Sequence, residues 1–309
     1  MTKITASLPA LKLSFSAGQG FNEDRAVCKR YADIRLLAAF DGCGGVGAKR
    51  YPQVNNHTGA YIAAGLYADC LEKWFAKNAY DLPQARTGQE LCTLFQQTAL
   101  TYHRRYLEST PSAVTGSMVR ALPSTAAIAL LFSDSSATVY WAGNTRGYLL
   151  TERGLWQQTE DDLATQCDAF ESLYADAPIS NFLCADQAFA LHERRVKLPE
   201  KGVLVLATDG AFHALPTPMH FEALLLGTMQ EAQTKIQWRR LLKNRLHPQA
   251  ADDVTLLLQP FGFSALDEMK AHFDKRRRHV QQAYILPADQ AERDSLTALK
   301  TLWELYLKE

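Results

Sequence analysis

The sequence has no excess of charge, because 33 Lys and Arg residues balance 33 Asp and Glu residues in a chain of 309. General nucleic-acid-binding proteins present a basic surface, so this balance leaves only a local site to attract an anionic partner. The longest strongly apolar run, Ala126–Phe132, is far shorter than the roughly 18 to 20 residues that span a bilayer. We therefore expect neither a nucleic acid nor a membrane among the partners.

The chain also lacks the features of an exported or disulfide-stapled protein. Its first segment, MTKITASLPALKLSF, has no signal-peptide core, and its six cysteines include no C-x-x-C pair. Scattered cysteines of this kind are typical of reduced thiols in a cytosolic protein. The sequence therefore predicts a cytoplasmic location, and it contains no internal repeat or low-complexity tract.

Short apolar segments separated by turn residues predict two blocks of β-strands. The first block covers residues 11–42, and two amphipathic helices follow at Tyr61–Phe75 and Leu91–Tyr106. The second block covers residues 124–210, where the short spacing indicates an antiparallel meander, because parallel neighbours need a helix-sized crossover. The acidic, weakly periodic segment Asp161–Gln187 interrupts this block and predicts a long surface insertion over the sheet.

The last part of the chain is predicted to be mainly helical. Helical spacing continues from Gly210 to about Arg245, one strand follows at Val254–Phe261, and two helices are expected after Ser264. Their apolar stripes are Leu266, Met269, Phe273 and Val280 in one helix, and Leu296, Leu299, Trp303 and Tyr306 in the other. The basic run Lys275–His279 is typical of a solvated helix face.

Acidic residues stand at the ends of the most apolar strands. Asp41 and Asp209 each follow such a strand directly, and Asp252 comes just before another. In an antiparallel sheet the end of one strand lies beside the start of its neighbour, so these carboxylates can converge at one edge. Glu23 and Asp24, at the mouth of a further strand, can join them.

Such a group of carboxylates indicates a metal site. Without Lys or Arg nearby, the acids would raise each other's pKa unless a cation kept them ionised. Oxygen ligands favour magnesium, manganese or calcium over zinc. A single Asp-Gly pair more often marks a turn, but three such acids together with Asn22-Glu23-Asp24 favour the metal.

Six segments, in order, resemble the motifs of the metal-dependent protein phosphatases of type 2C, the PPM family. They are FNEDR (Phe21–Arg25), FDGCGG (Phe40–Gly45), PSTAAIALL (Pro123–Leu131), WAGNTRGYLL (Trp141–Leu150), LATDGAF (Leu206–Phe212) and ADDVTLLL (Ala251–Leu258). The resemblance implies an α+β fold, a four-layer α/β/β/α sandwich with two central antiparallel β-sheets flanked by helices. It also divides the chain into a catalytic domain at 1–262 and a C-terminal helical extension at 263–309.

The same resemblance implies a site with two Mg²⁺ or Mn²⁺ ions. Asp41 would bridge both ions, the Gly42 carbonyl would bind one, Asp209 and Asp252 would bind the other, and Glu23 would act through a water. A metal-bridging hydroxide would attack phosphoserine or phosphothreonine without a covalent phospho-enzyme. The implied partner is a phosphorylated protein, together with a cognate Ser/Thr kinase, and the oligomeric state stays open.

The sequence departs from the family pattern at the phosphate-binding position. Gln19 stands four residues before Glu23, where many members have an arginine that grips the substrate phosphate. Loss of that bidentate contact lowers phosphate affinity unless Arg25, Lys49 or Arg50 replaces it.

Three other departures lie at functional positions. Asn144 and His213 stand where the family often has acids that bear on a third metal, so we expect that site to be lost or altered. His213 is either structural, a proton donor or a contact to phosphate. Cys43, where animal members often have a histidine, is expected to be structural.

These departures keep two other functions open beside an active protein phosphatase. The chain could be a catalytically weak phosphoprotein-binding regulatory module of the same fold. It could also be a two-metal enzyme that acts on a small phosphomonoester or nucleotide.

Overall fold

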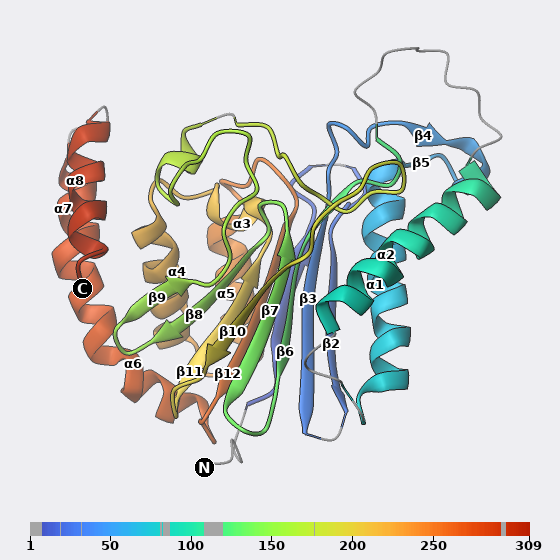
Figure 1. The fold of residues 1–309 in the computed structure, drawn as a ribbon. Coiled ribbons are helices and arrows are strands. Elements are labelled where there is room, and N and C mark those ends of the chain that lie inside the picture. The colour runs from blue at the N-terminus through green and yellow to red at the C-terminus, as the bar shows by residue number, and fades with distance from the viewer. Residues whose placement is uncertain are drawn as a thin grey trace.

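Two antiparallel sheets form the centre of the molecule (Figure 1). The computed structural model describes residues 8–18, 20–31, 33–80, 82, 87–107, 120–175, 177–291 and 295–309. The first sheet has the order β1 (Leu11–Phe15), β12 (Val254–Phe261), β11 (Gly202–Ala207), β8 (Arg146–Thr151), β9 (Gly154–Gln157). The second has the order β10 (His192–Lys197), β7 (Ser136–Ala142), β6 (Ser124–Leu131), β3 (Ile34–Gly42), β2 (Arg25–Tyr31). A small pair, β4 (Arg50–Tyr51) and β5 (His57–Thr58), lies apart from both.

Helices cover the outer face of each sheet (Figure 1). The helices are α1 (Gly59–Asn78), α2 (Thr87–Tyr102), α3 (Asp209–Phe212), α4 (Pro218–Glu231), α5 (Lys235–Leu246), α6 (Leu266–Val280), α7 (Leu286–Gln290) and α8 (Leu296–Tyr306). The first two share a hydrophobic cluster with the second sheet, and α4, α5 and α6 share another with the first sheet. The predicted α+β sandwich of two antiparallel sheets flanked by helices is thus confirmed.

The central strands are continuously apolar because both of their faces are covered. In β3, Leu36, Ala38 and Phe40 face the helices, whereas Leu37 and Ala39 face the other sheet. Side chains alternate along a strand, so a strand buried on both faces needs an apolar residue at each position. This requirement places the acid at the end of the strand, where Asp41 reaches the edge of the sandwich.

The predicted meander is correct in pairing direction and wrong in sheet membership. All of the paired strands in the two large sheets are antiparallel, but the chain changes sheet repeatedly after β7. Strands β8 and β9 join the first sheet, β10 returns to the second, and β11 joins the first again. Local spacing reports the direction of a strand, but it carries no information on which of two similar apolar faces the strand will join.

The C-terminal helices share the hydrophobic cluster of the first sheet. Met269, Phe273 and Val280 of α6 are fully buried there, and Trp303 and Tyr306 of α8 join the same cluster. Two expectations are corrected. Leu296, which was predicted to belong to the apolar stripe of the last helix, is 50% exposed. Arg276, from the run predicted to be solvated, is buried and pairs with the buried Glu222 at 2.9 Å.

The segment Asp161–Gln187 is irregular, as predicted. It contains one short 3-10 turn, Glu171–Leu173, and passes over the upper edge of the sandwich in Figure 1. Isolated bridges connect Leu163 with Ile179 and Ser124 with Leu183. Among the described residues, no helix combines the length and the apolar character needed to cross a bilayer.

Candidate metal and phosphate site

Three predicted metal ligands line one cavity of about 430 Å³. Asp41 comes from the end of β3, Asp209 from the start of α3 directly after β11, and Asp252 from the turn before β12. Strands β11 and β12 are antiparallel neighbours, so the end of one lies beside the start of the other. The main chain of Gly42 lines the same cavity.

The electrostatics of this edge favour a bound cation. Burial raises the pKa of Asp41 well above its ordinary value, and the charge of Asp209 raises it further. Partial burial, followed by the charge of Asp209, also raises the pKa of Asp252. Carboxyls that repel one another in this way are held in the ionised form by a divalent cation.

The donor set fits an ion that keeps part of its water shell. The Oδ1 atom of Asp209 is buried and has no hydrogen-bond partner within the described structure. No group of three or more His, Cys, Asp or Glu side chains among the described residues could hold a metal ion by itself. Magnesium is usually held by one or two carboxylates and several waters, and it rarely occupies a closed cage of protein ligands. An open group of a few carboxylates therefore suits magnesium.

Glu23 lies in an adjoining cavity of about 300 Å³, which Asp252 also lines. The hydroxyl of Thr58 donates to Glu23 and accepts from the main-chain N–H of Tyr61, so the start of α1 orients this carboxylate. Asp253 accepts the Glu23 main-chain N–H at 2.6 Å and thereby fixes the loop. Asp252 is thus the member of the pair that faces both cavities.

The four predicted phosphate contacts lie in different places. Arg25 donates to the main-chain oxygens of Asn22 and Asp24, each at 2.7 Å, and lies over the Tyr61 ring. Lys49 lies over the ring of Tyr51 at 5.2 Å.

Only Arg50 of the four lines either cavity, where it stands beside Glu23 and donates to the Asn56 oxygen at 3.1 Å. His213 follows α3, is exposed, and makes an edge contact with the Phe212 ring.

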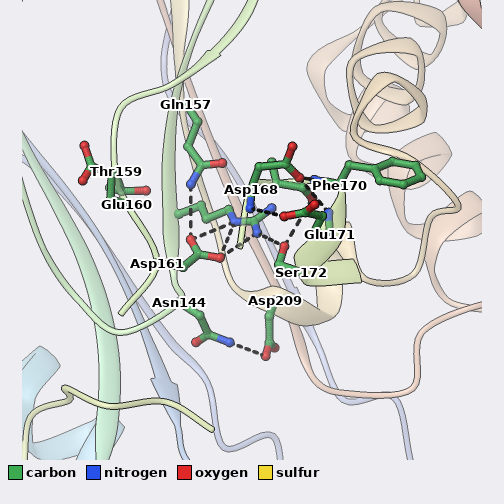
Figure 2. Close-up of polar contacts among 12 residues, drawn as sticks. Asn144, Gln157, Thr159, Glu160, Asp161, Asp168, Phe170, Glu171, Ser172 and Asp209 are labelled. Atoms are coloured by element: carbon green, nitrogen blue, oxygen red, sulfur yellow. Dashed lines mark hydrogen bonds and ion pairs between the residues drawn. The ribbon is translucent and has the colours of Figure 1, made fainter. Parts of the chain in front are cut away.

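Two of the departures from the family pattern lie directly at the site, and Gln19 lies outside the described residues. The amide of Asn144 donates to Asp209 Oδ2 at 2.9 Å (Figure 2). An amide in place of an acid therefore gives Asp209 a hydrogen-bond donor where a carboxylate would repel it. Cys43 lines the cavity, and burial raises the pKa of its thiol well above the ordinary value, which makes a thiolate unfavourable.

The structure adds residues that sequence reasoning missed. Arg120, just before β6, lines the cavity of the three carboxylates, as do Ser180 and Gln187 of the insertion. The insertion also contributes an apolar wall formed by Pro178, Ile179 and Phe182. No motif surrounds Arg120, so only the fold could reveal its position.

The sequence matches no model of a protein family and no curated protein. Solved structures do match. A bacterial serine phosphatase superimposes with a TM-score of 0.61 and 20% identity, over 81% of this chain and 96% of its own. The serine/threonine phosphatase Stp1 from Staphylococcus aureus gives 0.60 and 19%, over 82% and 94%. The serine/threonine phosphatase PstP/Ppp from Mycobacterium tuberculosis gives 0.57 and 20%, over 82% and 98%.

This chain has the fold of bacterial serine/threonine phosphatases. At these identities the likeness concerns the fold. The fold implied by the type 2C resemblance is therefore confirmed, while the chemistry depends on the residues at the edge of the sandwich.

Proposed function

We propose that this protein is a metal-dependent protein serine/threonine phosphatase. The observation that carries the proposal is the convergence of Asp41, Asp209 and Asp252 from three separate strand ends into one cavity. The buried, unpartnered Oδ1 atom of Asp209 supports a cation at this position. The likeness in fold to bacterial serine/threonine phosphatases supports the same reaction class.

Two Mg²⁺ or Mn²⁺ ions would supply Lewis-acid chemistry, lowering the pKa of water and offsetting charge on the phosphoryl group. The residues suited to hold them are Asp41, Gly42 through its carbonyl, Asp209 and Asp252. Glu23, oriented by Thr58, is suited to accept a hydrogen bond from water at the edge of this group. With these groups in place, hydrolysis needs no nucleophilic side chain.

The proposed substrate is a phosphoserine or phosphothreonine side chain of a protein, and the cognate partner would be the kinase that phosphorylates it. A chain with no net charge attracts such an anion through its local site and not through its whole surface. The cavity combines the acidic group with the apolar wall of Pro178, Ile179 and Phe182, which suits the carbon part of a peptide.

Metal content and phosphate release, measured on one preparation with Mn²⁺, test this function. Wild type should release phosphate from phosphothreonine peptides faster than from free phosphoesters. Asp209→Asn should lower kcat/KM by about a hundredfold or more, since a carboxylate ligand of the proposed metal ions, and with it their stabilisation of the transition state, is lost. Absence of release from both phosphopeptides and p-nitrophenyl phosphate would instead favour the weak binding module.

A further inference from the structure

The cavity of the three carboxylates contains one basic side chain among its described lining residues, Arg120. Its main-chain N–H donates to the Val46 oxygen at 2.9 Å, in the glycine-rich turn that follows Asp41. The next residue, Ala121, donates its N–H to Asp186 of the insertion at 3.1 Å. The backbone at Arg120 is thus fixed between the acidic edge and the insertion.

The charge of Arg120 is available to a ligand. Its Nε atom donates to Gln187 Oε1 at 3.0 Å, and a neutral amide orients a guanidinium without neutralising it. No ion pair within the described part of the chain neutralises Arg120. Several other arginines, such as Arg194 with Glu160 and Arg245 with Glu231, are already paired with a carboxylate.

The other basic residues near the site are less suitable. Arg25 is engaged by the main chain of its own loop, and Lys49 lies against Tyr51. Arg50 lines the neighbouring cavity, where its charge lowers the pKa of Glu23 against the larger effect of burial. Arg120 alone among these four shares a cavity with both Asp41 and Asp209.

We propose that Arg120 binds the phosphoryl group of the substrate and that Gln187 positions its guanidinium. This inference rests on the proposed phosphatase function. Arg120 would make the contact to phosphate that Gln19, which stands in place of an arginine, does not provide. A guanidinium presents paired N–H groups that match phosphate oxygens, and an ammonium group does not. The insertion then takes part in substrate binding through Gln187.

Kinetics of Arg120→Ala and Arg120→Lys test the assignment, with a phosphothreonine peptide and p-nitrophenyl phosphate as substrates and Mn²⁺ present. Arg120→Ala should raise KM for both substrates by about ten- to a hundredfold, the effect of losing a charge-assisted contact. Arg120→Lys should give an intermediate KM. Gln187→Glu should also raise KM, because a carboxylate would neutralise the arginine. The matched control is Arg240→Ala, an exposed arginine on α5.

Calorimetric binding of inorganic phosphate to the Mn²⁺-loaded protein gives a readout independent of turnover. Phosphate should bind Arg120→Ala more weakly than wild type by a similar factor, with unchanged Mn²⁺ affinity. Unchanged phosphate affinity, or a KM rise for the peptide alone, would overturn the assignment while the phosphatase function stands. If wild type hydrolyses no phosphoester, the function fails, and weaker phosphate binding by Arg120→Ala still supports the contact.

Discussion

Gly210 occupies the position where α3 approaches the turn before β12 most closely. A Cβ atom there would lie 2.1 Å from the main-chain oxygen of Asp253 and 2.8 Å from that of Asp252. Only glycine permits this approach, which brings Asp209 beside Asp252. Both residues of the Asp-Gly pair therefore matter to the proposed metal site, since the acid would supply a ligand and the glycine allows the two strand ends to meet.

Replacement of Gly210 by alanine should accordingly damage stability and metal binding together. We expect Gly210→Ala to lower the free energy of unfolding by about 1–3 kcal/mol, because main-chain atoms must move to admit the methyl group. Mn²⁺ affinity should fall as Asp252 is displaced. Urea denaturation and titration calorimetry measure the two effects.

Gly65→Ala is the control for that change. Gly65 lies inside α1, and a Cβ atom there would be 3.9 Å from its nearest neighbour, the Arg25 side chain. This substitution should leave metal affinity unchanged and stabilise the helix by up to about 1 kcal/mol. A Gly210→Ala protein with wild-type stability and Mn²⁺ affinity would refute the role given to the close approach.

At the scale of elements, one buried guanidinium joins β8 to the insertion. Arg146 pairs with Asp161 at 2.6 Å, and their side chains are only 2% and 7% exposed. It also donates to Ser172 Oγ at 2.6 Å. Figure 2 shows Asp161 and Ser172 together with the Asn144 and Asp209 pair. The same guanidinium lies 4.0 Å from the centre of the Phe212 ring in α3. The insertion is therefore fixed to the helix that begins with Asp209.

The burial of this pair predicts a large effect of breaking it. Asp161→Asn should lower the free energy of unfolding by about 3–5 kcal/mol, because Arg146 would remain buried with its charge uncompensated. The neighbouring Glu160 pairs with Arg194 at the same distance, 2.6 Å, but these side chains are 79% and 39% exposed. Glu160→Gln should cost about 0–1 kcal/mol. Equal losses for the two variants in urea denaturation would contradict this account.

Across the whole molecule, the features predicted from sequence are those with a local physical cause. Strands β3, β6, β11 and β12 were recognisable because burial on both faces demands an uninterrupted apolar run. The acids Asp41, Asp209 and Asp252 were recognisable because each lies at the end of such an apolar run. The structure then brings Asp41, Asp209 and Asp252 into one cavity.

Features that depend on distant contacts could not be predicted. Arg120 has no surrounding pattern, and its place beside Asp41 follows from the pairing of β6 with β3. Arg276 belongs to a basic run that looks solvated, yet it lies on the same helix face as Phe273 and meets Glu222 of α4. The carboxylate that compensates its charge is 54 residues away in the chain, beyond any local reading of the sequence.

The C-terminal helices are held by a polar network around Arg276. Its guanidinium contacts Glu222 and Glu309, and the Tyr306 hydroxyl donates to Glu222 at 2.7 Å. Glu309 also accepts hydrogen bonds from His279, at 2.5 Å, and from Tyr284. These contacts join α6 and α8 to α4. The negative charge of Glu309 therefore helps to attach α8 to the rest of the molecule.

The attachment of α8 should therefore weaken in acid. Burial opposes ionisation of Glu309, but hydrogen bonds from Tyr284, His279 and Arg276 outweigh it and lower its pKa from 4.5 to about 2. A lowered pKa stabilises the folded state above pH 4.5, and this contribution is lost as the pH falls from 4.5 towards 2. The protection of the α8 amides against hydrogen exchange, taken relative to their intrinsic exchange rate at each pH, should accordingly fall across that range.

Two variants, Glu309→Gln and Glu304→Gln, separate the effect of Glu309 on the opening of α8 from the effect of other carboxyls that titrate in the same pH range. Glu309→Gln should already open α8 more at neutral pH and should show a flatter response between pH 4.5 and 2. Glu304→Gln, an exposed position on the same helix, should follow wild type. Because both variants retain the acidic edge of the sandwich, their difference reports the network alone. Identical acid responses of Glu309→Gln and wild type would show that the network around Arg276 does not hold α8.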